Sequence, residues 1–257
     1  MKQLVLGRAN MSLSTFEQPL PDSRCQEAAS GHDVKGELIE GNWHIYPEIA
    51  TAGLWTTPTE LAKWAIEITN TWNGSVSKLL SKSMATQMMT SQEHPSGVGI
   101  FLEGTDKVIN FSHGGGNAGF QSHFFMFPAV GKGAVMMTNA DLGGILIGEV
   151  IPSIAAEYDW PGHIQSERDV VNLEISQIND VPGTYYVPNL PVELSFEISQ
   201  LGDRLFVEIK NIPLRYEIYP IGIDEFISSN GLGITFIRDN LGQVTKMNIA
   251  GLEAIRQ

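Results

Sequence analysis

The sequence has very little cysteine, and its potential metal ligands are dispersed. Cys25 is the single cysteine, so the chain has no internal partner for a disulfide bond. The six histidines are scattered along the chain, and no group of Cys and His residues has the spacing of a zinc site. We therefore expect no disulfide framework, no bound metal and no cofactor.

Basic residues and long apolar segments are also scarce. The chain carries 16 Lys and Arg against 29 Asp and Glu, a formal net charge of -13, and no basic cluster reverses this balance locally. Such a surface repels a phosphate backbone, which excludes nucleic acid as a partner. No stretch has the length of a membrane span, and the first residues lack the apolar run of a signal peptide. We expect a soluble chain, and its cellular location stays open.

The remaining composition is that of a globular protein, since 42% of the 257 residues are hydrophobic. Residues 1–50 are irregular and predict loops with short helical turns. The segment "TTPTELAKWAIEITNTW" then predicts a helix, with Thr57 as N-cap, Pro58 in the first turn and Glu60 completing a capping box. The apolar residues expected on its buried face are Leu61, Trp64, Ala65 and Ile68.

The pattern continues with a second helix, a set of strands and a third helix. "SKLLSKSMATQMMTSQ" predicts a helix capped by Ser81, with Met84, Met88 and Met89 facing inward. From residue 97 the apolar period changes to two, which predicts an antiparallel meander of short strands. Helical spacing returns after residue 141, and Pro152 is expected to kink that helix.

The last third of the chain differs from the rest. Residues 161–182 are polar and flanked by prolines, which indicates a linker, and residues 183–257 alternate as short strands separated by turns. We therefore predict an α+β fold, in which residues 1–160 form an antiparallel sheet with flanking helices and residues 183–257 form a small all-β barrel or sandwich. The side chains expected to fill the barrel are Leu194, Phe196, Leu205, Val207, Ile234 and Phe236.

One segment, "FSHGGGNAGFQSHFF" at residues 111–125, contains an unusual glycine run. Gly114, Gly116 and Gly119 satisfy the GxGxxG dinucleotide pattern, but a strand-like sequence follows where that pattern requires a helix. The "HGGG" loop of α/β-hydrolases needs a GxSxG nucleophile elbow, which the sequence lacks. A third hypothesis is that the glycines only form a bulge or a strained strand end.

Four stretches, in order, resemble the serine β-lactamase and penicillin-binding-protein superfamily, in its class C-like branch with D-alanyl carboxypeptidases and esterases. They are "LVLGRANMSLSTF", "AGLWTTPTELAKWAIEI", "GVGIFLEG" and "FSHGGGNAGFQSHFFMFPAVGKGAVMMTNAD", although Arg8 and Ala9 depart from the pattern of the first. Residues 183–251, more loosely, resemble a lipocalin-like barrel that some members of the family carry. This resemblance implies part of a β-lactamase/transpeptidase-like domain followed by the barrel.

The resemblance also implies a site on the glycine run. His113, Gly114 and Gly115 match the family's third motif, so His113 would contact a substrate carboxylate or share in proton transfer. Gly116 would give its backbone N–H to the oxyanion hole, and Gly114, Gly115 and Asn117 would bind substrate. If His113 were buried against other side chains, a non-catalytic role would be favoured.

The family's nucleophile is not where the resemblance requires it. The family needs Ser-x-x-Lys and Tyr-x-Asn (or Ser-x-Asn) motifs upstream of the matched segments, whereas the one Ser-x-x-Lys here, Ser75 to Lys78, comes after "AGLW", in the wrong order along the chain. Ser228-Ser229-Asn230 mimics the second motif in a predicted turn of the barrel. We therefore expect the C-terminal portion of a longer serine hydrolase, which is inactive alone.

The expected reaction of the complete protein is acyl transfer on an amide or ester, such as a β-lactam or a D-Ala peptide. Its partner would be a small-molecule or peptide substrate. The portion seen here would expose an apolar sheet edge, and so would form a homo-oligomer or pair with a missing N-terminal half. The alternative is a non-catalytic binding or oligomerisation module with the same fold.

Overall fold

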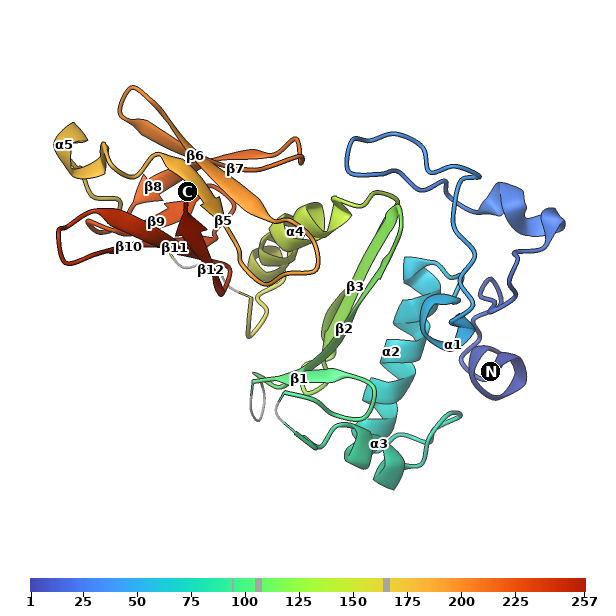
Figure 1. The fold of residues 1–257 in the computed structure, drawn as a ribbon. Helices are drawn as coiled ribbons and strands as arrows, with labels where there is room; N and C mark the ends of the chain where they lie inside the picture. Colours follow the sequence, from blue (N-terminus) through green and yellow to red (C-terminus); the bar gives the residue numbers. More distant parts are fainter. Residues whose placement is uncertain (94, 105–107, 164–166) are drawn as a thin grey trace. The chain divides into compact units, whose positions relative to one another are not determined.

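The computed structural model describes residues 1–93, 95–104, 108–163 and 167–257. The chain divides into two compact units, residues 1–165 and 166–257, which are described separately. In Figure 1 the first unit runs from blue to yellow-green and the second from yellow to red. Whether residues 1–160 and 183–257 are independently folding domains joined by a linker stays a prediction.

The first unit begins with irregular chain, as predicted for residues 1–50. Its short turns are the π-helix η1 (Lys2–Leu6), the 3-10 helix η2 (Asp22–Glu27) and α1 (Ile49–Ala52). The longer helices follow in the predicted segments: α2 (Pro58–Trp72), α3 (Lys82–Met88) and α4 (Gly143–Glu157). Pro152 lies inside α4, which continues past it to its last turn. No helix in the described ranges combines the length and apolarity needed to cross a bilayer.

The sheet of the first unit is the predicted antiparallel meander. Its strands pair in chain order. They are β1 (Phe101–Glu103), β2 (Asn110–Asn117), β3 (Phe120–Phe127) and β4 (Lys132–Thr138). The glycine run lies on β2 and is followed by β3, so the helix that a dinucleotide site requires is not there. The predicted strand "DKVINFSH" falls partly on residues 106 and 107, which lie outside the described residues.

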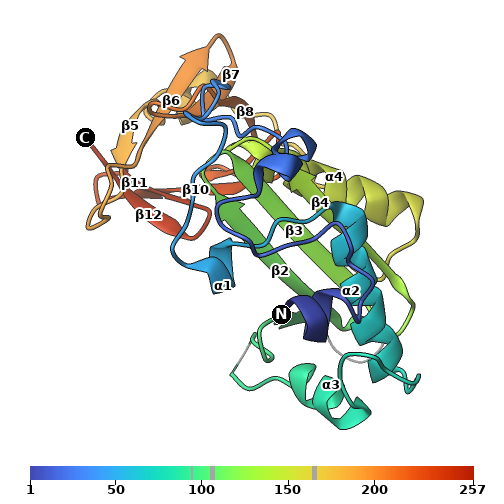
Figure 2. The ribbon, with the colours of Figure 1, turned by 90° about the vertical axis from the view of Figure 1, so that its right-hand side faces the viewer.

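Each face of this sheet packs against one long helix. Figure 1 shows the sheet from its edge, with α2 and α4 on opposite sides, and Figure 2 shows α2 crossing in front of β2, β3 and β4. On the α2 side, Ala65 and Ile68 pack with Phe111 and Phe124 in a buried cluster, which Leu61 and Trp64 join. The predicted apolar face of α2 is therefore confirmed. On the other side, Phe125, Phe127 and Trp160 pack with residues of α4, among them Ala155.

Two local predictions about these helices were partly wrong. Thr57 does cap α2, with its side chain accepting from the Glu60 N–H at 3.2 Å, but Glu60 does not return the bond. Its carboxylate instead accepts from the Leu13 N–H at 3.0 Å and pairs with Lys63. Ser81 caps α3 as predicted, whereas Met84 is 54% exposed and does not face inward. The Glu60 error comes from a contact with a distant segment, which the local pattern does not contain.

The second unit is a closed antiparallel barrel, which decides between the predicted barrel and sandwich. Its strands follow the closed order β10-β11-β12-β5-β6-β7-β8-β9. Their bounds are β5 (Gly183–Tyr186), β6 (Ser195–Leu201), β7 (Arg204–Ile209), β8 (Arg215–Pro220), β9 (Glu225–Ser228), β10 (Gly233–Arg238), β11 (Val244–Ile249) and β12 (Leu252–Arg256). The pairing of β12 with β5 closes the barrel.

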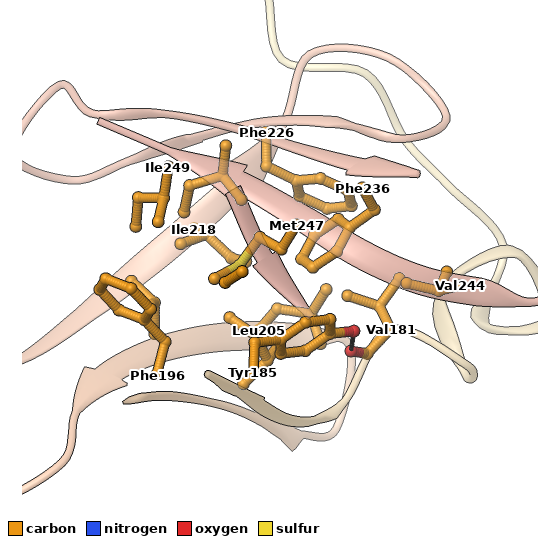
Figure 3. Packing of buried hydrophobic residues seen from close by; sticks show 14 of the residues in the cluster. Val181, Tyr185, Phe196, Leu205, Ile218, Phe226, Phe236, Val244, Met247 and Ile249 are labelled. Carbon is orange, nitrogen blue, oxygen red and sulfur yellow. Dashed lines mark hydrogen bonds between the residues drawn. The ribbon is translucent and has the colours of Figure 1, made fainter. Parts of the chain in front are cut away.

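Side chains fill the barrel interior, as Figure 3 shows. Five of the six residues predicted to fill it are buried there, and Leu194 packs against them partly buried. The polar segment before the barrel contributes to the same core. It contains the short helix α5 (Ile175–Ile178), and Ile178 and Val181 are buried among the barrel residues.

Candidate functional site

The second half of β2 is an open strand edge. β1 pairs only with residues 110–112 of β2, through Glu103↔Asn110 to Phe101↔Ser112. From His113 to Asn117, β2 pairs with β3 on one side and with no described strand on the other. A strand edge of this kind presents unpaired backbone donors and acceptors to an incoming group.

The register of the hairpin decides which donors face that edge. Asn117 and Phe120 are partners across a two-residue loop, so they form the hydrogen-bonded pair that closes the hairpin. Hydrogen-bonded pairs recur at every second residue of an antiparallel ladder, which gives His113 and Gly115 the same orientation as Asn117. The N–H groups of Gly114 and Gly116 therefore point away from β3, toward the open edge.

Three contacts from distant parts of the chain hold the hairpin tip. The Ala118 N–H donates to the Tyr46 hydroxyl at 2.8 Å, and the Gly119 N–H donates to Asp141 Oδ1 at 2.6 Å. Asn117 Nδ2 donates to the Ala52 carbonyl at 3.0 Å. The Asn117 amide thus anchors α1 to β2, and its predicted contact with substrate stays a prediction.

Side chains of β3 occupy the space that side chains at residues 114–116 would need. A Cβ on Gly115 would lie 2.6 Å from Ser122 Oγ, which is too short for two non-bonded atoms, so the Ser122 side chain would have to move. A Cβ on Gly114 would lie 3.5 Å from His123 Nδ1, and one on Gly116 would lie 3.2 Å from Gln121 Oε1. The glycines therefore leave room for β3 side chains and keep the backbone of β2 accessible.

His113 stands at the start of the open edge with an exposed side chain. Its Nδ1 lies 2.5 Å from the Gly114 carbonyl oxygen, and its ring centroid lies 5.3 Å from that of Phe101. The pairing of His113 with Phe124 places its side chain on the face of the sheet that α2 covers. The burial that would have favoured a non-catalytic role is not observed.

The opposite face of the same strand borders a hollow of about 460 Å³ between the glycine run and α4. Gly144, Ile147, Gly148 and Ile151 form its wall on α4, and Gln121, Ser122 and His123 form its wall on β3. Burial lowers the pKa of His123, and the nearby His163 and His113 lower it further, against a smaller opposing effect of Glu103. The His123 imidazole is therefore held in its neutral form.

Sequence reasoning missed His123 and Gln121 as residues of this region. Their pairing with Gly114 and Gly116 places them on the same face as those glycines. The alternation of strand residues was a signal for this, but only once the pairing of β2 with β3 and the position of α4 were known.

Comparison with protein families identifies the chain. The model of the beta-lactamase family matches residues 1–144, more than half of the sequence and all of the sheet described above. The chain belongs to the beta-lactamase family. A comparison with curated proteins found no match.

Two solved structures show the same fold as this beta-lactamase family member. A crystal structure of SurE aligns with a TM-score of 0.50 and 17% identity over 100% of this chain and 62% of that chain. The octameric penicillin-binding protein homologue from Pyrococcus abyssi aligns with a TM-score of 0.51 and 16% identity over 99% of this chain and 59% of that chain. The chain thus spans about three fifths of the length of each, and at these identities the likeness shows the fold alone.

The serine motifs of the chain do not have the geometry of a family nucleophile. Ser75 lies in irregular chain after the end of α2, so it does not open a helix as the Ser-x-x-Lys serine must, and the Lys78 N–H donates to Glu67 Oε1 at 2.7 Å. In the barrel, the Ser228 hydroxyl donates to Asn230 Oδ1 at 2.5 Å, within the turn that joins β9 to β10. Among the described residues, no group of three or more His, Cys, Asp or Glu side chains is arranged to hold a metal ion.

Proposed function

We propose that the open edge of β2 is part of the acyl-transfer site of a serine hydrolase that acts on an amide or an ester, such as a β-lactam or a D-Ala peptide. The observation that carries this proposal is the orientation of Gly116, whose N–H points away from β3 on an edge that no described strand covers. Membership of the beta-lactamase family supports the same reaction class.

The chemistry needs a donor at this place. Attack on a carbonyl carbon moves negative charge onto the carbonyl oxygen, and a positioned N–H stabilises that charge in the transition state. Gly116 supplies this donor on the part of β2 that no described strand covers. His113, exposed at the start of the same edge, contacts a substrate carboxylate or shares in proton transfer.

The nucleophile in this proposal comes from polypeptide outside residues 1–257. Ser75 lies in irregular chain and Ser228 is the last residue of β9, so neither serine opens the helix that activates a family serine. Residues 1–257 are therefore expected to be inactive by themselves. Incubation with a fluorophosphonate probe and with a fluorescent penicillin should leave it unlabelled, and stoichiometric labelling of any serine within it would overturn this assignment.

The role of Gly116 is tested in a longer protein that includes the coding sequence upstream of Met1. Gly116→Pro removes the N–H, and we expect acylation by a fluorescent penicillin or an ester substrate to slow by about 100-fold or more. Gly116→Ala is the matched control, because it keeps the N–H and its methyl group would meet only the flexible end of Gln121. Equal rates for the two variants would remove Gly116 from the mechanism.

The alternative, an oligomerisation module, would use the unpaired edge of β4. β4 has α2 on one face and α4 on the other, as an interior strand of a sheet has, yet it pairs with β3 alone among the described strands. An upstream reading frame without Ser-x-x-Lys and Tyr-x-Asn, together with a stable oligomer in light scattering, would favour this alternative over the enzyme.

A further inference from the structure

The hollow behind the glycine run borders the same three residues as the proposed acyl-transfer edge. Gly114, Gly115 and Gly116 form one of its sides, so a carbonyl bound at the Gly116 N–H has this space directly beside it. Its volume of about 460 Å³ lies within the range of small-molecule sites, roughly 300 to 1,000 Å³. It is thus large enough to take one substituent of a substrate.

The walls of the hollow carry no charge. Ile147 and Ile151 give its α4 side an apolar surface, and Gly144 and Gly148 add no polar side-chain atoms. Gln121 and Ser122 are neutral, and the lowered pKa of His123 keeps its imidazole neutral at physiological pH. No described residue bordering the hollow provides a cation for a carboxylate.

Desolvation then decides which substituent fits. Moving a carboxylate from water against this surface without a charged partner costs free energy, whereas an alkyl group gains from the contact with Ile147 and Ile151. The net charge of -13 adds a general repulsion of anions. His123 and Gln121, whose side chains lie on the same face as the hollow, still offer hydrogen-bonding groups to a neutral amide or ester.

We propose that this hollow is a substrate subsite for an uncharged, apolar substituent, such as a short acyl chain, bound between the glycine run and α4. The inference rests on the proposed function, because it assigns the hollow to the substrate of the β2 edge. Such a subsite makes the enzyme selective for amides or esters whose substituent on the α4 side is neutral. His113, on the other face of β2, remains available to an anionic group elsewhere on the substrate.

The structure offers a clean blocking variant. A Cβ at Gly148 would meet no atom within 4 Å, so Gly148→Leu begins in open space, adds a side chain where α4 borders the hollow and also favours the helix. Glu149→Leu is the matched control, since it adds the same side chain to an exposed neighbouring position of α4 that does not border the hollow. Circular dichroism should show folded protein for both variants.

The probes are butyranilide and succinanilic acid, two stable amides that differ by a terminal methyl or carboxylate group. Binding to residues 1–257 is followed by NMR through the imidazole signals of the histidines, with the His123 signal assigned by its loss in His123→Gln. We expect butyranilide to shift the His123 signal and succinanilic acid to bind at least about tenfold more weakly. Gly148→Leu should weaken butyranilide binding by at least about tenfold, and Glu149→Leu should not change it.

Equal or tighter binding of succinanilic acid, an unchanged affinity in Gly148→Leu, or no shift of the His123 signal would overturn the subsite. This measurement needs no nucleophile, so its outcome is separate from that of the acylation test on Gly116. A subsite that binds butyranilide while Gly116→Pro acylates normally would leave the hollow in place and refute the mechanism. If butyranilide does not bind but Gly116→Pro acylates slowly, the subsite alone is refuted and the role of Gly116 stands.

Discussion

Tyr185 tests how the barrel interior is held together. Its side chain is fully buried, and its hydroxyl donates to the Val181 carbonyl at 2.6 Å, the hydrogen bond drawn in Figure 3. Tyr185→Phe keeps the ring and its packing against Phe236, whose centroid lies 5.7 Å away, but leaves the buried carbonyl without this donor. Because an unsatisfied buried acceptor costs about 1–3 kcal/mol, we expect the free energy of unfolding to fall by that amount at neutral pH.

The same side chain gives the barrel a pH dependence. Burial raises the pKa of Tyr185 from 10.0 to about 12, although Arg256 opposes part of this shift. A group whose pKa is raised on folding contributes fully below its unfolded pKa and loses that contribution as the pH rises through the folded value. At about pH 11, one unit above the unfolded pKa, the protein should have lost roughly 1.4 kcal/mol through this group. Phenylalanine cannot ionise, so the advantage of the wild type over Tyr185→Phe should shrink by the same amount.

Two measurements check this reasoning. At neutral pH, native-state hydrogen exchange read by mass spectrometry at peptides from β5 and β6 reports the stability of the barrel strands. Urea titrations of both proteins, followed by far-UV circular dichroism near neutral pH and at about pH 11, give the change in their difference. All five tryptophans lie in the first 160 residues, so tryptophan fluorescence follows the first unit as an internal control. An unchanged exchange rate in Tyr185→Phe, or a difference that stays constant up to about pH 11, would refute the argument.

Two further predictions concern α2. Thr57→Ala should lower the free energy of unfolding by about 1 kcal/mol through loss of the N-cap, whereas Thr57→Ser should restore most of it, as thermal unfolding followed by tryptophan fluorescence will show. Burial raises the pKa of Glu60, but the hydrogen bonds from Lys63 and the Leu13 N–H outweigh it, so the pKa is lowered overall. Its stabilising contribution is therefore present above the unfolded value of 4.5 and lost as the pH falls below it. Glu60→Gln should lower stability by about 1–2 kcal/mol at neutral pH and remove this acid dependence, and parallel slopes for the two proteins in acid denaturation would contradict the assignment.

Local sequence patterns predicted the elements whose signals lie within a few residues. Thr57 and Pro58 mark the start of α2, and strict alternation marks β6 and β7, because capping and strand pleating act over one turn or one residue. β12 was not predicted as a separate strand. The turn before it consists of Ala250 and Gly251, both at positive φ, and alanine gives no turn signal at such a position.

The candidate site was predictable only in part, for a similar reason. A motif match could propose His113 and Gly116, because those residues are adjacent in sequence. The hollow depends on which face of β3 carries His123 and on where Gly148 of α4 lies, and these positions are set by pairing and packing between distant segments. The same limitation explains why Glu60 was predicted to close a capping box, since its actual partner Leu13 is 47 residues away.

The third glycine of the nucleotide-like pattern shows how packing gives such a motif its meaning. Gly119 has a φ of +77°, in the turn that joins β2 to β3, and a Cβ there would lie 2.7 Å from the Gly31 Cα and 2.8 Å from Ile39. Both the turn and the close approach of the loop around Gly31 therefore require glycine. Its N–H donates to Asp141, which fixes the hairpin tip and with it the edge on which Gly116 lies. The spacing of these glycines thus follows from a tight hairpin with an accessible edge, a geometry that suits a carbonyl oxygen and needs no phosphate.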